Sequence, residues 1–285
     1  MKRHIVIYTN DQKDRKNRVA NSIIRFLYEN NIKWTLFHDP ISTDKDPADR
    51  FCQEEKESIM DAEIMMVLGG DGTMLRASHL SVDCQLPMVG VNLGTLGYMA
   101  QIDPSGLEAA LKLLLRKEYE IQTRMLLDVS IQPFGNQASI QDWVLNDIVL
   151  SRVGPIKINS IQTYVNDTFL HEYEADGMII ATPTGSTGYS LSARGPIVAP
   201  TAQVILMTPI CAHSLAQGSV VLSGEDRVQL NLPCGRERQS QVMDVSFDGR
   251  SVRKLRTDDV IRIRKSEKTA QVVLIHHQSF LDVLY

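Results

Sequence analysis

The sequence predicts an α/β N-terminal domain, in which helices flank a parallel sheet, followed by an all-β, sandwich-like C-terminal domain. In the first 120 or so residues, short apolar runs alternate with segments of helical period, which is typical of βαβ units. From Met125 the chain breaks into many short β-rich segments separated by Gly, Pro, Asn and Asp. We therefore expect the domains to span residues 1–124 and 125–265, a division that suits a chain of 285 residues.

The N-terminal pattern predicts each element in turn. Strands are expected at residues 5–8, 34–38, 64–68 and 87–92, and helices at 19–28, from 74 onward and at 102–116. Asp103 and Pro104 form a natural cap and first turn for the last helix. In the second half, strands are expected at residues 126–131, 143–151, 161–165, 177–182, 204–208, 228–232, 242–247 and 260–264, with a possible helix at 186–193.

The composition limits the classes of function. Hydrophobic residues make up 43% and charged residues 22% of the chain, as in ordinary globular proteins. A net charge of −4 disfavours a nucleic-acid partner. The four cysteines form no C-x-x-C pair, and no apolar run suits a signal peptide or membrane span. We expect a cytoplasmic protein with reduced thiols and neither a nucleic-acid nor a membrane partner.

A glycine-rich turn around Asp71 is the most informative feature. Gly69, Gly70 and Gly72 follow an apolar strand and precede a helix. Glycines and free N–H groups at a helix N-terminus are suited to binding phosphates. A carboxylate beside a polyphosphate is repelled unless it holds a cation or takes a proton from an attacking hydroxyl, which indicates phosphoryl transfer. The alternative is that Asp71 only caps the helix.

Three further segments have the character of binding loops. Residues 92–98 form a second strand-end glycine loop, which could face the first across a crevice or be an ordinary turn. Asn146 and Asp147 interrupt an apolar strand, where they either reach a ligand or mark a bulge or edge. Residues 176–192 gather hydroxyls, small residues and Tyr189 in one bend that suits a nucleoside.

Several familiar motifs are missing. The chain has no P-loop and no G-x-G-x-x-G after the first strand, and its histidines lack the spacing of metal ligands. Thr184 stands where the first glycine of a nucleophile elbow belongs, so Ser186 is not predicted to be a nucleophile.

In order and spacing, these segments resemble the successive signatures of bacterial NAD kinases, the ATP-NAD kinase family, across nearly the whole chain. The glycine-aspartate turn alone also resembles that of lipid and sugar kinases of the same superfamily. The resemblance implies transfer of the γ-phosphoryl group of ATP to the 2′-hydroxyl of the adenosine ribose of NAD, with Mg²⁺ or another divalent cation. It also implies a tail, residues 266–285, that returns to complete the first domain, and a homo-oligomer, a dimer or a tetramer.

The resemblance also assigns residues. Asp71 corresponds to the proposed general base, while Asn146 and Asp147 correspond to the pair that holds the adenosine part of NAD, and Asp248 aligns near a late NAD contact. The full set of expected NAD and ATP contacts is Asp71, Gly72, Arg76, Asn146, Asp147, Lys157, Glu174, Asp176, Thr187, Gly188, Tyr189, Ser190, Leu191, Ser192, Cys211 and Arg250.

Three positions depart from the family pattern. Asp147 replaces the usual Glu, Gly188 stands where Ala is common, and Glu174 stands where NAD-specific members often have Arg, which leaves acceptance of NADH open. Two rival functions also remain at this point, a lipid or sugar kinase and a non-catalytic dinucleotide sensor.

Overall fold

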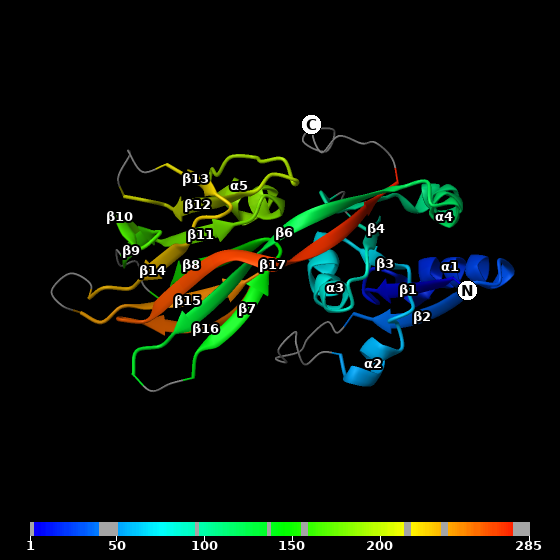
Figure 1. Ribbon diagram of the computed structural model, residues 1–285, viewed down its shortest axis with the longest axis horizontal. Helices are drawn as coiled ribbons and strands as arrows, with labels where there is room; N and C mark the ends of the chain where they lie inside the picture. The colour runs from blue at the N-terminus through cyan, green and yellow to red at the C-terminus, as the bar shows by residue number, and fades with distance from the viewer. Residues whose placement is uncertain are drawn as a thin grey trace. The chain divides into compact units, whose positions relative to one another are not determined.

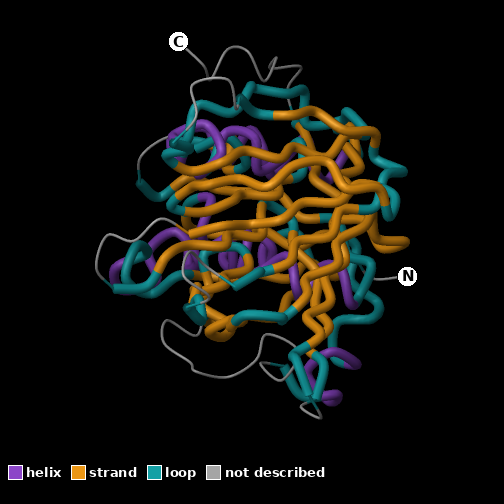
Figure 2. Tube along the Cα trace, turned by 90° about the vertical axis from the view of Figure 1, so that its left-hand side faces the viewer, coloured by secondary structure: helices purple, strands orange, loops and turns teal. Residues whose placement is uncertain are grey.

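The computed structural model describes residues 3–39, 51–94, 97–135, 138–154, 159–213, 218–234 and 239–275. The chain divides into two compact units, unit 1 (Met1–Thr123 with Ala270–Tyr285) and unit 2 (Arg124–Thr269) (Figure 1). More of the described chain lies in strands than in helices (Figure 2). Within the described ranges, no helix is both long and apolar enough to cross a membrane.

Unit 1 contains a parallel sheet, as predicted. Its central strands follow the order β2 (Lys33–His38), β1 (His4–Thr9), β3 (Ile64–Gly69) and β4 (Met88–Asn92). Beyond β4, both the short β5 (Ala100–Ile102) and the end of β17 (Val260–Leu274) run parallel to it, with Val272 opposite Met88 (Figure 1). The C-terminal segment therefore adds a strand to the N-terminal sheet.

Helices cover both faces of this sheet. The helices α1 (Arg18–Glu29) and α4 (Leu107–Arg116) share one apolar cluster with alternate strand residues, because each places its apolar positions on one side. The helix α3 (Asp71–Asp83) packs on the opposite face, where a Cβ on Gly90 would lie 3.0 Å from Met74 Sδ. The described elements of the unit also include η1 (Arg15–Asn17), α2 (Gln53–Glu57) and η3 (Pro104–Gly106), which Asp103 caps by accepting from Ser105 N at 2.8 Å.

Unit 2 is a β-sandwich. One sheet has the order β10-β9-β14-β17, with β6 paired with β17 and β7 paired with β6, and the other has the order β13-β12-β11-β8-β15-β16. Side chains from both sheets form a single buried cluster, which confirms the predicted architecture. The strands are β6 (Glu120–Gln132), β7 (Ile140–Val144), β8 (Asp147–Arg152), β9 (Asn159–Val165), β10 (Thr168–Ala175), β11 (Gly177–Ala181), β12 (Val204–Ile210), β13 (Val220–Ser223), β14 (Val228–Asn231), β15 (Val242–Phe247) and β16 (Arg250–Arg256).

The strand expected at residues 143–151 is in fact two strands in different sheets. β7 ends at Val144 and pairs with β6, whereas β8 begins at Asp147 and lies between β11 and β15. Leu145 and Asn146 make the crossing, and neither a bulge nor an edge position explains the polar pair. The helix expected at 186–193 is two short turns, η4 (Thr184–Thr187) and α5 (Tyr189–Ser192).

Candidate active site

The carboxylate of Asp71 does not cap the helix that it begins. Gly70 is the N-cap of α3 and accepts from the amides of Thr73 at 2.9 Å and Met74 at 3.0 Å. The Asp71 side chain instead accepts from Tyr98 N at 2.8 Å and Met99 N at 3.0 Å. Asp71 therefore holds the chain that follows the second glycine loop, and the helix-cap alternative is wrong.

The two glycine turns lie side by side in unit 1, which is one of the two arrangements that the sequence left open. Leu93 N donates to the carbonyl of Gly69 at 2.8 Å, so the chain after β4 is bonded to the end of β3. A Cβ on Gly97 would lie 2.2 Å from Asp71 Oδ1, which only a glycine at this position avoids. This close approach places the carboxylate between the turns.

Arg76 is bound to a buried carboxylate. The Asp39 side chain has no exposed surface and accepts from Arg76 Nε at 2.8 Å, Tyr8 Oη at 3.0 Å and Asn10 Nδ2 at 3.1 Å. The hydrogen bond to Asp39 raises the pKa of Arg76. The guanidinium keeps one nitrogen toward the turn, since a Cβ on Gly72 would lie 3.6 Å from Arg76 Nη1.

In unit 2, a second buried carboxylate holds the crossing between β7 and β8. Asp248 accepts from the amides of Leu145 at 2.9 Å, Asn146 at 2.7 Å and Asp147 at 3.0 Å. Thr182 N donates to the carbonyl of Asn146 at 2.9 Å from the other side. Asp248 is thus a positioning residue for the polar pair, because three backbone donors surround its carboxylate.

The side chains of Asn146 and Asp147 point toward the turn at Gly188. A Cβ on Gly188 would lie 3.6 Å from Asn146 Nδ2 and 3.7 Å from Asp147 Oδ2. Asn146 Oδ1 is buried without a hydrogen-bond partner in the described part of the chain. A buried amide oxygen without a partner is costly, so this geometry suits a ligand that donates to it.

Burial and a neighbouring charge favour a proton on Asp147. Desolvation, and then repulsion by Asp248, raises the pKa of Asp147 to about 7. Burial also raises the pKa of Asp248, to about 6, but its three amide donors favour the ionised form. Asp248 therefore ionises first, and Asp147 keeps its proton to near neutral pH.

The other expected contacts are spread over unit 2. Asp176 pairs with Arg152 Nε at 3.2 Å, Ser190 Oγ lies 3.1 Å from Thr208 Oγ1 inside the unit, and Arg250 pairs with Asp142. Tyr189 is 46% exposed, with Ser192 exposed and Leu191 and Thr187 half-buried beside it. Glu174 lies in β10 and Cys211 is exposed after β12, whereas Lys157 lies outside the described residues.

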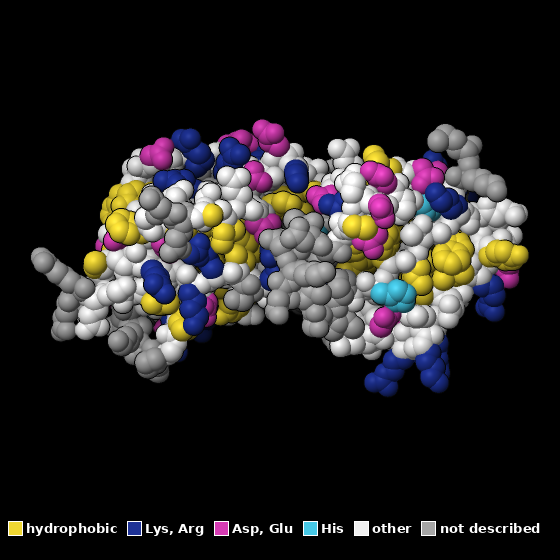
Figure 3. Space-filling model, turned by 90° about the horizontal axis from the view of Figure 1, so that it is seen from below, with side chains coloured by type: hydrophobic (Ala, Val, Ile, Leu, Met, Phe, Trp, Pro, Cys, Tyr) yellow, Lys and Arg dark blue, Asp and Glu magenta, His cyan; other side chains and the backbone are white. Residues whose placement is uncertain are grey.

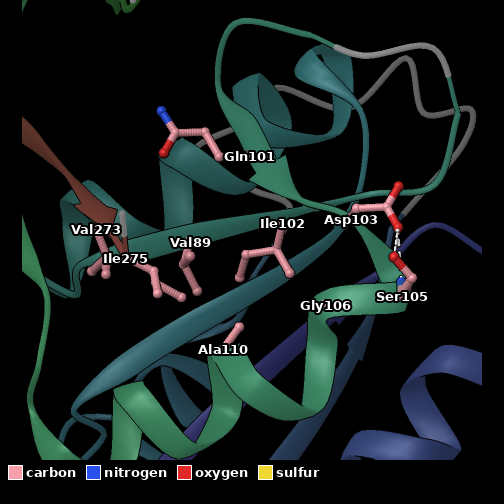
Figure 4. Close-up of a pocket in the computed structure, with 9 residues that line it drawn as sticks. All are labelled: Val89, Gln101, Ile102, Asp103, Ser105, Gly106, Ala110, Val273 and Ile275. Carbon is pink, nitrogen blue, oxygen red and sulfur yellow. Dashed lines mark hydrogen bonds between the residues drawn. The ribbon is translucent and has the colours of Figure 1, made fainter. Parts of the chain in front are cut away.

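Two hollows in the described structure are not binding sites formed by the glycine turns or the polar pair, because of their lining or their position. A cavity of about 210 Å³ in unit 1 is lined mainly by aliphatic side chains beside α4, and its one carboxylate, Asp103, is bonded to Ser105 (Figure 4). In unit 2, a groove of about 640 Å³ follows the outer sheet face, where Arg262 and Arg264 are exposed. Acidic and basic side chains are interspersed over the face drawn in Figure 3.

Sequence reasoning missed the residues that support the site. Asn10 and Asp39 directly follow the strands β1 and β2, at the edge of the sheet where Asp71 follows β3 and Asn92 ends β4. Carboxyl ends of parallel strands form the ligand edge of such sheets, and this rule alone could have identified both.

Comparison with known proteins accounts for this arrangement. Residues 5–119 match the model of the ATP-NAD kinase N-terminal domain, and residues 145–275 match that of the C-terminal domain. An NAD kinase of Agathobacter rectalis is 36% identical over 99% of this chain and 97% of its own length. The chain belongs to the NAD kinase family. An NAD kinase of Caldanaerobacter subterraneus subsp. tengcongensis is 34% identical, over 98% of this chain and 96% of its own.

Two solved structures share the fold of this NAD kinase family member. Yeast NADH kinase complexed with NADH has a TM-score of 0.81 at 24% identity, covering 99% of this chain and 85% of that one. An Archaeoglobus fulgidus NAD kinase in complex with ATP has a TM-score of 0.70 at 23% identity, covering 99% and 96%. At these identities the likeness establishes the fold alone.

The raised pKa of Asp147 predicts a pH-dependent stability. Below about pH 7 the folded protein binds a proton that the unfolded chain releases near pH 4, so stability falls as pH rises through this window. Asp147→Asn removes that loss. We expect the unfolding free energy of the variant, relative to the original protein, to increase by on the order of 2 kcal/mol from about pH 5 to about pH 8 in urea titrations.

The matched control for this titration is Asp167→Asn, because the Asp167 side chain in the same unit is 83% exposed. Its relative stability should not change over this range. If Asp147→Asn behaved like this control, Asp147 would be ionised throughout, and the repulsion between the two carboxylates would be absent.

Proposed function

We propose that this NAD kinase transfers the γ-phosphoryl group of ATP to the 2′-hydroxyl of the adenosine ribose of NAD, giving NADP and ADP. Membership of the family supports ATP-dependent phosphorylation of NAD. The observation that carries the proposed mechanism is the carboxylate of Asp71, which lies between two glycine turns at the start of α3. Phosphoryl transfer needs positioning and charge neutralisation more than covalent chemistry.

Asp71 acts as the general base in this mechanism. Each oxygen of its carboxylate accepts from a backbone amide, Tyr98 N or Met99 N, and an ionised carboxylate retains further lone pairs. One of these takes the proton of the ribose hydroxyl while that oxygen attacks the γ-phosphorus. The bond from phosphorus to the bridging oxygen then breaks, and ADP leaves.

The glycine turns and the first turn of α3 hold the ATP phosphates. The amides of Asp71 and Gly72 precede the first bonds within the helix, and Arg76 directs Nη1 toward Gly72. In the described part of the chain, no three His, Cys, Asp or Glu side chains gather as a metal site. A site with few carboxylates fits Mg²⁺, because the ATP phosphates themselves supply most of the ligands of this ion. When bound, the ion would neutralise the charge that develops on the phosphates.

NAD is recognised by the polar pair of unit 2. Asn146 presents an amide whose oxygen lacks a partner among the described residues, which suits a nucleoside edge that donates. Asp147, once ionised, accepts from ribose hydroxyls, and the exposed ring of Tyr189 offers an apolar face.

Replacing the base tests the mechanism. Asp71→Asn should fold, but we expect turnover to fall at least ~100-fold, because a positioned base contributes about 10²–10⁴ in rate. NADP formation from NAD, ATP and Mg²⁺, read with an NADP-specific dehydrogenase, measures this loss. Asp83→Asn, on the same helix and paired with Lys56, serves as the control and should retain activity.

The same assay separates the rival functions. Near-full activity of a folded Asp71→Asn variant would contradict the role of the base. If the original protein bound NAD without producing NADP, a dinucleotide sensor would replace the kinase. Phosphorylation of a lipid or a free sugar in place of NAD would move the chain to another branch of the superfamily.

If Asn146 binds NAD, its replacement should affect the KM for NAD more than the KM for ATP. Asn146→Ala removes the side-chain amide but keeps the backbone bonds to Asp248 and Thr182. We expect the KM for NAD to rise more than the KM for ATP, roughly tenfold for the loss of one or two hydrogen bonds. Steady-state kinetics with each substrate varied in turn measures both, and equal increases would indicate a purely structural role.

We also propose a cytoplasmic homo-oligomer. The described cysteines Cys52, Cys84, Cys211 and Cys234 are all free, which suits a reducing compartment. The edge strand β10 exposes Phe169 and Leu170, at 52% and 43%, which suits a contact between copies. Light scattering should give a mass of two or four chains, and Phe169→Ser should lower it if β10 contributes. A monomer at micromolar concentration would contradict this proposal.

A further inference from the structure

The ammonium group of Lys13 lies over both glycine turns of unit 1. A Cβ on Gly70 would lie 2.8 Å from Lys13 Nζ, and a Cβ on Gly94 would lie 3.5 Å from it. Gly70 follows β3 and Gly94 follows β4, so one cation reaches the ends of two neighbouring strands. The missing side chain at Gly70 is what permits this approach.

The backbone that carries Lys13 is fixed in place. Asn10 Oδ1 accepts from the amides of Gln12 at 3.1 Å and Lys13 at 3.2 Å. The amide of Asn10 donates to the carbonyl of Leu68 at 3.0 Å, and its side chain donates to Asp39 at 3.1 Å. The lysine is therefore attached to the end of β3, immediately before the glycine turn.

The next residue fixes the other side of this segment. Asp14 is buried and accepts from Val19 N at 3.0 Å and Ala20 N at 2.9 Å, at the start of α1. Lys13 thus extends from a short segment held at both ends, and only its side chain is free to adjust.

Lys13 differs from the other basic residue at this edge of the sheet. Arg76 donates to Asp39, so its charge is largely neutralised inside unit 1. Among the described residues, no carboxylate lies within ion-pair distance of Lys13 Nζ. An ammonium with three donors and no acidic partner, set beside exposed glycine backbone, suits a phosphate.

We propose that Lys13 binds the terminal phosphates of ATP and holds them between the two glycine turns. This inference rests on the proposed function, since that function places the ATP phosphates at the glycine turns. A strongly hydrated point charge suits the oxygens of a triphosphate, which also repel the nearby Asp71 carboxylate. Lys13 offsets that repulsion and defines the position of the phosphoryl donor.

The test compares Lys13→Met, which keeps the length of the side chain and removes its charge, with Lys16→Met as the control. Lys16 is exposed and lies three residues further along the same segment. For Lys13→Met we expect the KM for ATP to rise at least ~10-fold, with the KM for NAD changed less than about twofold. Lys13→Arg should recover part of the loss, and Lys16→Met should match the original protein.

A second readout isolates the phosphates from the rest of ATP. Inorganic tripolyphosphate should compete with ATP, and its inhibition constant should rise in Lys13→Met by the same factor as the KM for ATP. An unchanged inhibition constant, or a rise only in the KM for NAD, would overturn the proposal. Circular dichroism of each variant verifies folding, and Lys13→Arg keeps the test decisive if Lys13→Met does not fold.

These outcomes are separate from those that test the overall function. If the original protein formed no NADP, the proposed function would fail before any variant is compared. If it formed NADP and Lys13→Met kept the original KM for ATP and the original inhibition constant, only the assignment of Lys13 would fail.

Discussion

A carboxylate removed from water must be surrounded by hydrogen-bond donors, and this constraint shapes both units. An unpaired buried charge costs several kcal/mol, enough to threaten a fold of ordinary stability. Asp39 meets the constraint with a guanidinium, a phenol and an amide, which joins the ends of β1 and β2 to α3. Asp248 meets it with three backbone amides, which sets the crossing between β7 and β8. The candidate binding loops of each unit take their positions from the buried carboxylate of that unit.

The Asp248 arrangement leaves Asp147 with a carboxyl group that is buried and close to another charge, which is why its pKa is near neutral. Ribose hydroxyls would supply the donors that favour its ionised form. Binding of the nucleotide and release of a proton from Asp147 would then be linked. The buried Asp248 carboxylate therefore positions Asn146 and Asp147, and it also raises the pKa of Asp147.

The sequence predicted most of the fold because its central strands are apolar and its α1 and α4 helices amphipathic. It missed β10, whose first five residues are exposed, and β16, where only Val252 and Leu255 are apolar and stand three positions apart, since neither shows a clear buried pattern. The sequence also could not separate β7 from β8, because both sides of the crossing are apolar and only Asn146 and Asp147 mark it. At the site, motif spacing indicated Asp71 and the polar pair. Asp39, the partner of Arg76, lies 37 positions away, and Tyr8 and Asn10, which also donate to Asp39, lie 31 and 29 positions from it, so only the folded sheet brings them together.

The position of Asp71 beside a proposed triphosphate raises the question of how a carboxylate and an ATP anion can lie close together. Two amide donors stabilise its charge, but they do not reduce its repulsion of the phosphates. The charge of Arg76 is already neutralised by Asp39. Arg76 therefore offers a donor group held in a fixed orientation, but little net positive charge. Among the described residues at the turns, Lys13 supplies a positive charge that no carboxylate neutralises. A divalent cation bound to the phosphates would add to this charge. The Asp71 carboxylate can therefore lie close to the reacting phosphorus, because the charges that offset its repulsion of the phosphates lie over the glycine turns and not on the carboxylate itself.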